Sequence, residues 1–571
     1  MHGMLKQWEL RKIDTQAATA LASDISMHPL IAQILVARGI IRPDEARQFL
    51  VPSFSAMPDP YLLLGMDAAV SRLLMARGNH ESVCIYGDYD VDGITGTALL
   101  VSFLRMAGFI CRYFIPNRFN DGYGLNKDSI ELIIDMGATL IVSVDCGITA
   151  VDEARFCRQR GIDLIIVDHH APREIIPDAA AVINPLQPGC KYPFKSLAGV
   201  GVAFNLLVAL RSALRDEGVF TKEAQPDLRE WLDLVALGTI ADVMPLINQN
   251  RIYAFFGLRQ LSNSSKPGVQ SLKQVAGIKG EVSCGQVGFR LAPRLNAAGR
   301  MESAVPGVDL LLSLNPQETL EITTDLDAAN AERQAIERRM VDEAVDLVET
   351  AGDYPARRSI VLASENWHQG VIGIVASRLV ERYYRPTILI ALTEDGLAKG
   401  SGRSIPGFHL LDALGPCAQY MERFGGHCYA AGVSLKADLV AGFAEAFEAE
   451  AARILMDDDL VPRLIIDAEA RPEDITRELA LELKRLEPFG TGNPEPVLMM
   501  RAMTVTERRV VGDGHLRLRL TRDGRSFTAI AFRMAERDTV GLMDIAFFPE
   551  MNEWNGGSSL QLRVKDLRPT E

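Results

Sequence analysis

Short apolar runs alternate with helical patterns between about residues 80 and 245. Three of these runs are rich in β-branched and aliphatic side chains, at residues 82–86, 139–144 and 163–167. Parallel strands are buried on both faces and read as nearly continuous apolar runs, and strands that alternate with helices form a parallel sheet covered by helices. This part of the chain is therefore predicted to be an α/β domain.

The pattern changes after residue 315. Residues from about 316 to 350 are strongly helical and charged, which predicts a long connecting helix. A second α/β pattern follows at about 355–455. Beyond the glycine- and proline-rich segment 488–496, short alternating strands separated by turn signals predict a small β-barrel. The predicted organisation is a helical N-terminal segment 1–60, an α/β domain 61–315, a connecting helix 316–352, a smaller α/β domain 353–460 and a β-barrel 461–571.

Length and composition are those of an ordinary globular protein with several domains. The chain has 571 residues, of which 48% are hydrophobic and 23% charged, whereas one hydrophobic core stops growing beyond roughly 300 residues. The N-terminus lacks the apolar stretch of a signal peptide, and no later run approaches the roughly 18 apolar residues of a membrane span. We therefore expect a cytoplasmic protein.

Cysteine usage and net charge restrict the chemistry further. None of the eight cysteines forms a C-x-x-C pair, so neither a zinc ribbon nor a disulfide framework is indicated, and we expect reduced, mostly buried thiols. The formal net charge of -14 argues by itself against nucleic acid, because affinity for DNA comes from Lys and Arg that neutralise phosphates. An acidic metal site would account for many of the negative charges, however, and the clustering of positive charge decides binding.

Each of the three apolar runs is followed by an aspartate. Asp88 comes shortly after the first run, and Asp145 and Asp168 come directly after the second and third. Ligands of open α/β sheets bind beyond the carboxyl ends of the strands. The three carboxylates are therefore expected to meet at one edge of the sheet.

The segment Gly87-Asp88-Tyr89-Asp90-Val91-Asp92-Gly93 places three carboxylates at alternate positions. In an extended conformation all three would face one side, where their mutual repulsion requires a cation. The spacing also matches the start of a calcium-binding EF-hand loop. That loop needs a Glu where this chain has Leu99, and it follows a helix, not a strand. A simpler alternative is that a strand-end aspartate caps the next helix.

More metal-binding side chains belong to the same region. His169 and His170 follow Asp168 directly, and Asp242 ends the helical run Gly238-Thr239-Ile240-Ala241. A mixed set of Asp and His ligands of this size suits a pair of hard or borderline divalent ions, Mn²⁺ more than Ca²⁺. The sequence therefore predicts a site for two divalent metal ions, Mn²⁺ or Mg²⁺.

Four motifs, in this order, resemble the DHH phosphoesterase superfamily. They are Gly-Asp-x-Asp-x-Asp-Gly at 87–93, Val-Asp-Cys-Gly at 144–147, Asp-His-His at 168–170 and Ala-Asp-Val at 241–243. Within the superfamily, the segments 293–300, 367–377 and 425–427 and the C-terminal β domain resemble the RecJ exonuclease family. The resemblance covers nearly the whole chain. It implies a DHH catalytic domain, a DHH-associated substrate-binding domain and an OB-like domain that binds single strands.

The superfamily resemblance also implies a role for each matching residue. One metal ion would be held by Asp88, Asp90 and Asp145, and the other by Asp92, Asp145, His169 and Asp242, with Asp145 as the bridge. His170 resembles the residue that meets the scissile phosphate, and Asp168 resembles one that orients a ligand histidine. Many relatives have a ligand histidine where this chain has Tyr86. The first ion then depends more on Asp88 or is weakly held.

Three segments carry side chains suited to hold phosphates. The first contains Arg118 and Tyr123, the second Arg294, Asn296 and Arg300, and the third Ser401, Arg403 and His427. In the third segment, neighbouring glycines let backbone N–H groups approach an anion that Arg403 can pair with bidentately. The alternative for each segment is an ordinary turn with a surface arginine. His368 and His409 are weaker candidates, because a histidine beside Trp367 is as readily structural.

Residues 515–520 alternate with period two. His515, Arg517 and Arg519 share one face, and three leucines share the other. We expect the leucines inside the barrel and a basic face outside it, where OB-folds follow single strands; Arg508 and Arg509 add to the positive charge. A merely solvated face is the alternative.

The RecJ resemblance implies an exonuclease that hydrolyses single-stranded DNA to mononucleotides with two metal ions, in recombination and repair. It also implies that the group around Arg403 recognises the 5′ end, which gives 5′ to 3′ polarity. Single-strand-binding protein and a helicase are the implied protein partners, and we expect a monomer. Two alternatives stay open: a DHH phosphodiesterase acting on short oligonucleotides or cyclic dinucleotides, and a non-catalytic single-strand-binding scaffold. The C-terminal domain disfavours the first, and the complete ligand set disfavours the second.

Overall fold

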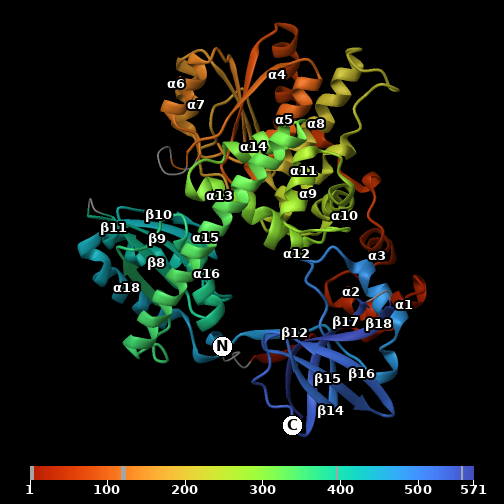
Figure 1. Cartoon of the computed structure of the whole chain (residues 1–571). Helices are drawn as coiled ribbons and strands as arrows, with labels where there is room; N and C mark the ends of the chain where they lie inside the picture. Colours follow the sequence, from red (N-terminus) through yellow and green to blue (C-terminus); the bar gives the residue numbers. More distant parts are fainter. Residues whose placement is uncertain (1–5, 118–121, 123, 394–395, 555–556, 571) are drawn as a thin grey trace. The chain divides into compact units, whose positions relative to one another are not determined.

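The chain divides into two units (Figure 1). A computed structural model describes residues 6–117, 122, 124–393, 396–554 and 557–570. The first unit, called the 47–331 unit below, combines residues 47–331 with 486–495. The second, called the 332–571 unit, combines the residues before 47 with 332–485 and 496–571. The domain limits expected from the sequence stay predictions.

The 47–331 unit is built on a five-stranded sheet in which all neighbouring strands pair in parallel, in the order β3-β2-β4-β5-β6. Its strands are β2 (Ser82–Gly87), β3 (Ile110–Phe114), β4 (Leu140–Val144), β5 (Asp163–Val167) and β6 (Ala181–Ile183). The three predicted strands are confirmed as β2, β4 and β5. They are the central strands, and burial on both faces explains why they read as continuous apolar runs.

Helices cover both faces of this sheet (Figure 1). Val83 and Ile85 of β2 pack in the core formed with α4 (Met66–Gly78), α5 (Val91–Met106) and α8 (Gly199–Asp216). Cys84 and Tyr86 point the other way, into the core formed with α6 (Lys127–Asp135) and α7 (Val151–Gln159). The remaining helices are α3 (Pro43–Leu50), α9 (Leu232–Ala241), α10 (Asn248–Asn263), α11 (Pro267–Val275), α12 (Cys284–Gln286), the π-helix η4 (Val287–Leu291), α13 (Ala292–Met301) and α14 (Val305–Leu312), with 3₁₀ turns η1 (Phe54–Ala56), η2 (Pro60–Leu62) and η3 (Leu228–Trp231).

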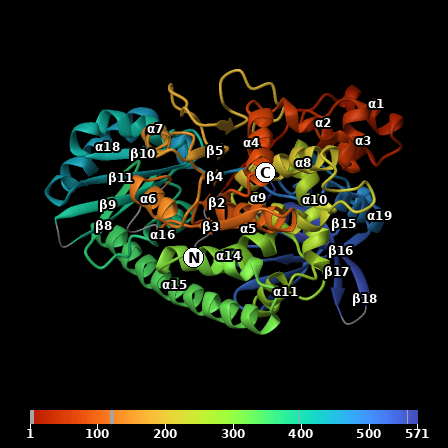
Figure 2. The same ribbon diagram turned by 90° about the horizontal axis from the view of Figure 1, so that it is seen from above.

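The long helix expected after residue 315 is confirmed as α15 (Pro316–Ala351), which runs unbroken in Figures 1 and 2. Asn315 precedes it, and its side chain accepts the N–H of Gln317 at 3.0 Å. Pro316 needs no hydrogen bond at the first helical position. At the other end Gly352 takes a positive φ of 68°, the conformation that ends many helices.

The 332–571 unit contains a second five-stranded sheet, in the order β10-β11-β9-β8-β7. Its strands are β7 (Ile360–Ser364), β8 (Thr387–Leu392), β9 (Leu397–Arg403), β10 (Arg423–Gly426) and β11 (Ala430–Lys436). Only β7 and β8 pair in parallel. The accompanying helices are α16 (Ile372–Tyr383), α17 (Leu410–Leu414), η5 (Gly415–Tyr420), η6 (Ala437–Leu439), α18 (Val440–Ile454) and η7 (Asp457–Leu460). The second α/β region is thereby confirmed.

The predicted C-terminal β-barrel is also confirmed. Strands β14 (Leu498–Val511), β15 (His515–Arg522), β16 (Arg525–Ala531), β18 (Gly557–Pro569) and β17 (Leu542–Trp554) pair in this order, and β14 pairs with β17 to close the barrel. The short strand β13 (Ala468–Glu469) pairs with β14, and α19 (Arg477–Leu483) with η8 (Pro472–Asp474) and η9 (Lys484–Leu486) precedes the barrel.

The N-terminal segment was expected to be helical, and it contains the helices α1 (Thr15–Asp24) and α2 (Pro29–Ala37). A strand, β1 (Gln7–Leu10), was missed; it pairs in parallel with β12 (Arg463–Ile466). All eight cysteines are free thiols and five are buried, as expected. None of the helices in the described ranges is long and apolar enough to cross a membrane.

A candidate two-metal centre and its surroundings

Three aspartates stand where central strands end. Asp88 follows β2, Asp145 follows β4 and Asp168 follows β5, and all three are buried. Asp145 has a positive φ of 63°, a conformation that Asp tolerates better than most residues. Helix α8 reaches it only because residue 199 is glycine: a Cβ there would lie 2.8 Å from the Cβ of Asp145. The close approach brings the amino end of α8 to the carboxyl edge of the sheet.

The expectation that residues 88–92 are extended is wrong. The chain turns into α5 directly after Asp88, so Asp90 is the N-cap and Asp92 lies in the first helical turn. Asp90 Oδ1 accepts the backbone N–H groups of Asp92 at 2.9 Å and Gly93 at 3.1 Å, because the first N–H groups of a helix have no partner within the helix. The capping alternative is thus correct for Asp90, and it does not compete with metal binding, since a carboxylate has two oxygens.

The predicted metal ligands, together with His170, form three overlapping groups. In each group one donor atom per residue lies within 4.8 Å of the others. The groups are Asp88, Asp90 and Asp145; Asp92, His169 and Asp242; and Asp145, His169 and His170. Asp145 belongs to the group with Asp88 and also to a group with His169. It therefore occupies the position that a bridging ligand needs.

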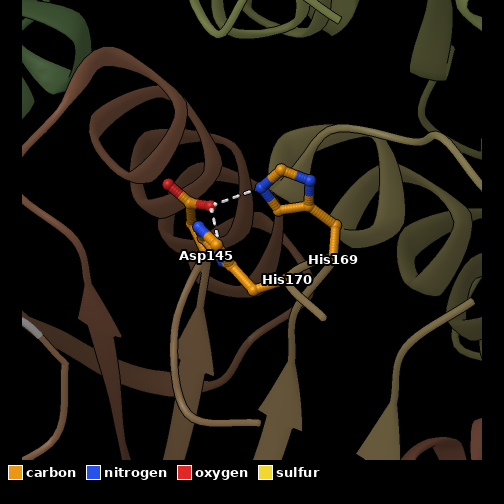
Figure 3. A group of neighbouring side chains, drawn as sticks. All are labelled: Asp145, His169 and His170. Carbon is orange, nitrogen blue, oxygen red and sulfur yellow. Dashed lines mark ion pairs between the residues drawn. The ribbon is translucent and has the colours of Figure 1, made fainter. Parts of the chain in front are cut away.

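His169 is the centre of the second group. Its Nε2 lies 3.0 Å from Asp145 Oδ1, 3.6 Å from Asp242 Oδ2 and 3.7 Å from Asp92 Oδ2. Figure 3 shows the rings of His169 and His170 beside the Asp145 carboxylate. Within the described part of the chain, Nε2 makes no hydrogen bond of normal geometry, although it is buried. A ring nitrogen that faces three carboxylate oxygens in this way fits a metal ligand.

The protonation energetics point the same way. Burial, followed by repulsion from Asp92 and Asp90, raises the pKa of Asp242 to about 9, and burial with the Asp90 charge raises the pKa of Asp92 to about 7. Burial and the neighbouring carboxylates also raise the pKa of Asp145. Burial lowers the pKa of His169 to about 4, so its ring is neutral and able to bind a metal. A divalent cation would let all these carboxylates ionise together.

Asp92 has further partners that sequence reasoning missed. The N–H groups of Gly199 and Val200, at the start of α8, donate to its two carboxylate oxygens at 2.6 and 2.9 Å. Backbone donors at a helix N-terminus stabilise a carboxylate and fix its orientation. The segment Gly199-Val200-Gly201 is the only sequence signal, and it points to a close approach without saying to what.

Asp168 orients a histidine, but that histidine is His170 and not the expected metal ligand His169. Asp168 Oδ1 lies 2.8 Å from His170 Nδ1. Burial opposes charge on both groups. Their mutual hydrogen bond nevertheless lowers the pKa of Asp168 to about 2 and raises the pKa of His170 to about 9. The ring of His169 has a backbone hydrogen bond at Leu197 instead. The Asp168 carboxylate is held beside the ring of His170 because it also accepts the backbone N–H groups of His169 and His170.

Tyr86 contributes no ligand to this centre. Its hydroxyl donates to the carbonyl of Gly124 at 2.9 Å, and its ring stacks on Phe114 with centroids 5.5 Å apart. The side chain is fully buried on the α6–α7 face of the sheet. The first group of ligands therefore consists of carboxylates alone.

The segment 293–300 contacts the aspartate loop, and its role in phosphate binding stays a prediction. Asn296 Oδ1 accepts the N–H of Val91 at 3.1 Å. Arg294 pairs with Asp327 at 2.8 Å and donates to the carbonyl of Arg290. These two residues were expected to contact phosphate, and the structure gives them other partners. The role of Arg300, which is half-buried, stays a prediction. Arg118 and Tyr123 lie outside the described residues.

Two members of the third predicted group, Ser401 and Arg403, are in contact in the 332–571 unit. Arg403 Nη1 donates to Ser401 Oγ at 3.2 Å, and both residues lie on β9. A Cβ on Gly373, in the first turn of α16, would lie 2.8 Å from Ser401 Oγ and 2.9 Å from Arg403 Nη2. An arginine, a hydroxyl and a helix N-terminus are the usual components of an anion site. His427 follows β10 in the turn that leads to Ala430, the residue paired with Arg403.

The two weaker histidine candidates have structural contacts. His368 Nδ1 accepts the N–H of Gly370 at 3.1 Å, in the turn that starts α16, and the neighbouring Trp367 is buried. His409 is the N-cap of α17, where its ring accepts the N–H of Asp412 at 3.2 Å. These contacts favour the structural interpretation of both residues.

The barrel strand β15 has the alternation that the sequence predicted. Leu516, Leu518 and Leu520 are buried, whereas Arg517 and Arg519 are exposed. Arg519 also pairs with Glu507 on the neighbouring strand at 3.2 Å. A basic strip lies on the outside of the barrel.

A parallel sheet that gathers Asp and His side chains at its carboxyl edge, in a chain that also contains a closed β-barrel, is the arrangement expected of a metal-dependent phosphoesterase. Comparison with known proteins identifies the kind. Residues 82–239 match the family model described as DHH family, N-terminal domain, residues 357–453 match the DHHA1 domain, and residues 466–566 match the RecJ OB domain.

The chain belongs to the RecJ family. It is 39% identical to the single-stranded-DNA-specific exonuclease RecJ of Bacillus subtilis, over 99% of this chain and 71% of the relative. It is 37% identical to the protein of that name from Escherichia coli, over 99% of this chain and 100% of the relative. The crystal structure of RecJ from Thermus thermophilus in complex with Mn²⁺ matches with a TM-score of 0.85 and 32% identity, covering 99% of this chain and 80% of that one.

A second crystal structure of the Thermus thermophilus protein, in complex with Mg²⁺, matches with a TM-score of 0.79 and 30% identity, over 99% of this chain and 79% of that one. The two ions are those expected from the sequence. The donors assembled here, carboxylate oxygens and imidazole nitrogens, suit the same ions.

Proposed function

We propose that this chain is a metal-dependent exonuclease that degrades single-stranded DNA from 5′ to 3′, hydrolysing it to mononucleotides in recombination and repair. The observation that carries the proposal is the position of Asp145, whose carboxylate is common to two groups of metal ligands at the edge of the sheet. Membership of the RecJ family supports the class of substrate.

The two ligand groups divide the metal-binding work. Asp88, Asp90 and Asp145 would hold one ion, and Asp92, Asp145, His169 and Asp242 the other. Two such ions supply an activated water and stabilise the attacking and leaving oxygens of an in-line displacement at phosphorus. The protein keeps the ligands in place through the backbone: the capping bonds of Asp90 and the two N–H donors to Asp92 leave those carboxylates little freedom.

His170 is the group we assign to the scissile phosphate. The hydrogen bond from Asp168 fixes its ring and favours its protonated form, which can donate to a phosphate oxygen. Asp168 itself is buried and acts through His170 and through the backbone of the loop. Its part in catalysis is to position the histidine.

We assign polarity and part of the substrate binding to the 332–571 unit. Ser401, Arg403 and His427 would bind a terminal phosphate, which gives 5′ to 3′ polarity if that phosphate is the 5′ one. Arg517 and Arg519 on the outside of the barrel would follow the sugar–phosphate backbone. We also propose a cytoplasmic monomer whose protein partners are single-strand-binding protein and a helicase.

The experiment that tests this function uses strands labelled at either end. Wild-type protein, Asp145→Asn and the control Asp135→Asn, an exposed residue at the end of α6, are incubated with single- and double-stranded DNA and Mn²⁺. We expect wild type and control to release 5′-labelled mononucleotide first, from single strands only, and Asp145→Asn to release none. Equal degradation of duplex, release from the 3′ end first, or an active Asp145→Asn would refute the corresponding part of the proposal.

A further inference from the structure

Phe289 is an exposed aromatic side chain that belongs neither to the metal centre nor to the basic segments. It is 81% exposed and lies in the π-helix η4, between α12 and α13 in the 47–331 unit. Isolated exposed apolar residues are common and need no function by themselves. A π-turn is different, because such turns are rare and occur frequently at functional sites.

The widened turn holds Phe289 outward. Val287 and Leu291 on either side are fully buried, and the N–H of Ala292 bonds to the carbonyl of Val287, five residues back. The guanidinium of Arg290 is tied to the carbonyl of Ala276. With its neighbours anchored in this way, Phe289 cannot turn into the core without breaking the turn. The turn therefore keeps the ring in solvent, where it is available to a ligand.

The helical run that carries Phe289 also meets the metal-binding loop. Residues 293, 296 and 300 recur at helical spacing, so they lie on one side of α13, the helix that continues directly from the π-turn of Phe289. Asn296 on that side accepts the N–H of Val91, between Asp90 and Asp92. Gly299 of the next turn packs against the same loop: a Cβ there would lie 2.8 Å from the carbonyl oxygen of Tyr89. Seven residues separate Phe289 from Asn296, which is about 10 Å along a helix.

A second exposed apolar side chain borders the centre. Val243 follows the candidate ligand Asp242 and is 66% exposed. Its φ of 58° is unusual for a β-branched residue, and strain of this kind is concentrated at functional sites. Helix α9, whose C-cap is Asp242, packs against η4. An exposed apolar side chain thus adjoins a candidate ligand, on a helix that packs against the π-turn of Phe289.

From this arrangement we propose that Phe289 stacks on a nucleobase of the substrate, close to the nucleotide whose phosphate lies at the metal centre. The inference rests on the proposed function and deepens it. Charged groups can hold phosphates of any nucleic acid, whereas the face of a base is available to an aromatic ring only when the base is not enclosed in a duplex. Phe289 would therefore contribute to the preference for single strands.

The test compares Phe289→Ala, Phe289→Trp and the control Leu314→Ala, another side chain more than four-fifths exposed in the 47–331 unit. Base stacking on an aromatic side chain is worth roughly 5- to 150-fold in binding. We expect Phe289→Ala to raise KM for single-stranded DNA about tenfold or more with little change in kcat, and Phe289→Trp and Leu314→Ala to resemble wild type.

A strand whose nucleotides near the degraded end are abasic separates stacking from other effects. On that substrate wild type and Phe289→Ala should have the same KM, because there is no base to stack on. An unchanged KM on normal DNA, or an equal loss on both substrates, would overturn the stacking role. The Mn²⁺ concentration at half-maximal activity should be the same for all variants. If wild-type protein does not degrade single strands at all, the proposed function fails, and that result is distinct from every outcome for Phe289.

Discussion

Replacing Arg251 should destabilise the 47–331 unit far more than replacing a matched arginine on the same helix. Arg251 on α10 is buried, and its guanidinium donates to the carbonyls of Phe49 at 2.9 Å, Leu486 at 3.0 Å and Glu487 at 2.7 Å. Its planar group also lies 3.9 Å from the centroid of the Phe49 ring. One side chain thus joins three segments that are far apart in the sequence.

The magnitude follows from these contacts. Hydrogen bonds to charged groups contribute roughly 1.5–3 kcal/mol each, and Arg251→Met removes three of them. Part of this loss is offset, because the uncharged Met side chain has no desolvation penalty for a buried charge. We expect a loss of about 3–5 kcal/mol in the free energy of unfolding. For a unit of this size each 1 kcal/mol lowers Tm by about 2–4 °C, so Tm should fall by roughly 10 °C.

The control is Arg259→Met on the same helix. Arg259 is exposed and lies 4.0 Å from the ring of Phe255, so its replacement removes a comparable stacking contact but no buried hydrogen bonds. Its loss should cost at most about 1 kcal/mol. Calorimetry gives Tm. Hydrogen exchange should speed up at residues 486–495 and at Leu246, whose N–H donates to the carbonyl of Thr491 at 2.7 Å. Equal Tm shifts for the two variants would show that the buried contacts of Arg251 contribute little.

Three further predictions concern the metal centre and the barrel. Mn²⁺ at a hundredfold excess over its Kd should stabilise the protein by about 2.7 kcal/mol, measured as a rise in Tm that EDTA reverses and that Asp145→Asn abolishes; an unchanged Tm would contradict metal binding at these carboxylates. Gly199→Ala places a Cβ 2.8 Å from that of Asp145, so the rate of strand degradation should fall about tenfold. Gly78→Ala is the control, because the space around Gly78 is open, and it should leave the rate unchanged. Equal activities of the two variants would show that α8 shifts to accommodate the added methyl group. Arg517→Ala with Arg519→Ala should lower the salt dependence of single-strand binding by about 1.4 in log–log slope, with the exposed Arg453→Ala as control; an unchanged slope would mean that this face is only solvated.

The strands of the metal centre and of the barrel could be predicted from the sequence. Strands β2, β4 and β5 were recognisable because burial on both faces makes each of them apolar without interruption, and their following aspartates had to meet at one edge. The alternation in β15 was recognisable for a similar reason, since one face of a barrel strand is buried and the other is wet. Both patterns are periodic and local, so each can be read within a few residues.

Other features depended on partners far away in the chain. The sequence suggested extended aspartates at residues 88–92, but the start of α5 made Asp90 a cap, and the amino end of α8 supplied the donors to Asp92. The bond that Asn296 accepts from Val91, 205 residues earlier, could not be foreseen from the segment that contains Asn296.

By itself the sequence determined the kinds of ligand, the strands that deliver them and the buried and exposed faces of the barrel, because strand and helix periodicity record burial locally. Only the tertiary structure decided that Asp168 holds His170, that β1 pairs with β12 and that residues 486–495 belong with the 47–331 unit. Such partners are chosen by which groups remain unsatisfied once the chain is packed, and a buried carbonyl or carboxylate takes whichever donor the fold brings within reach.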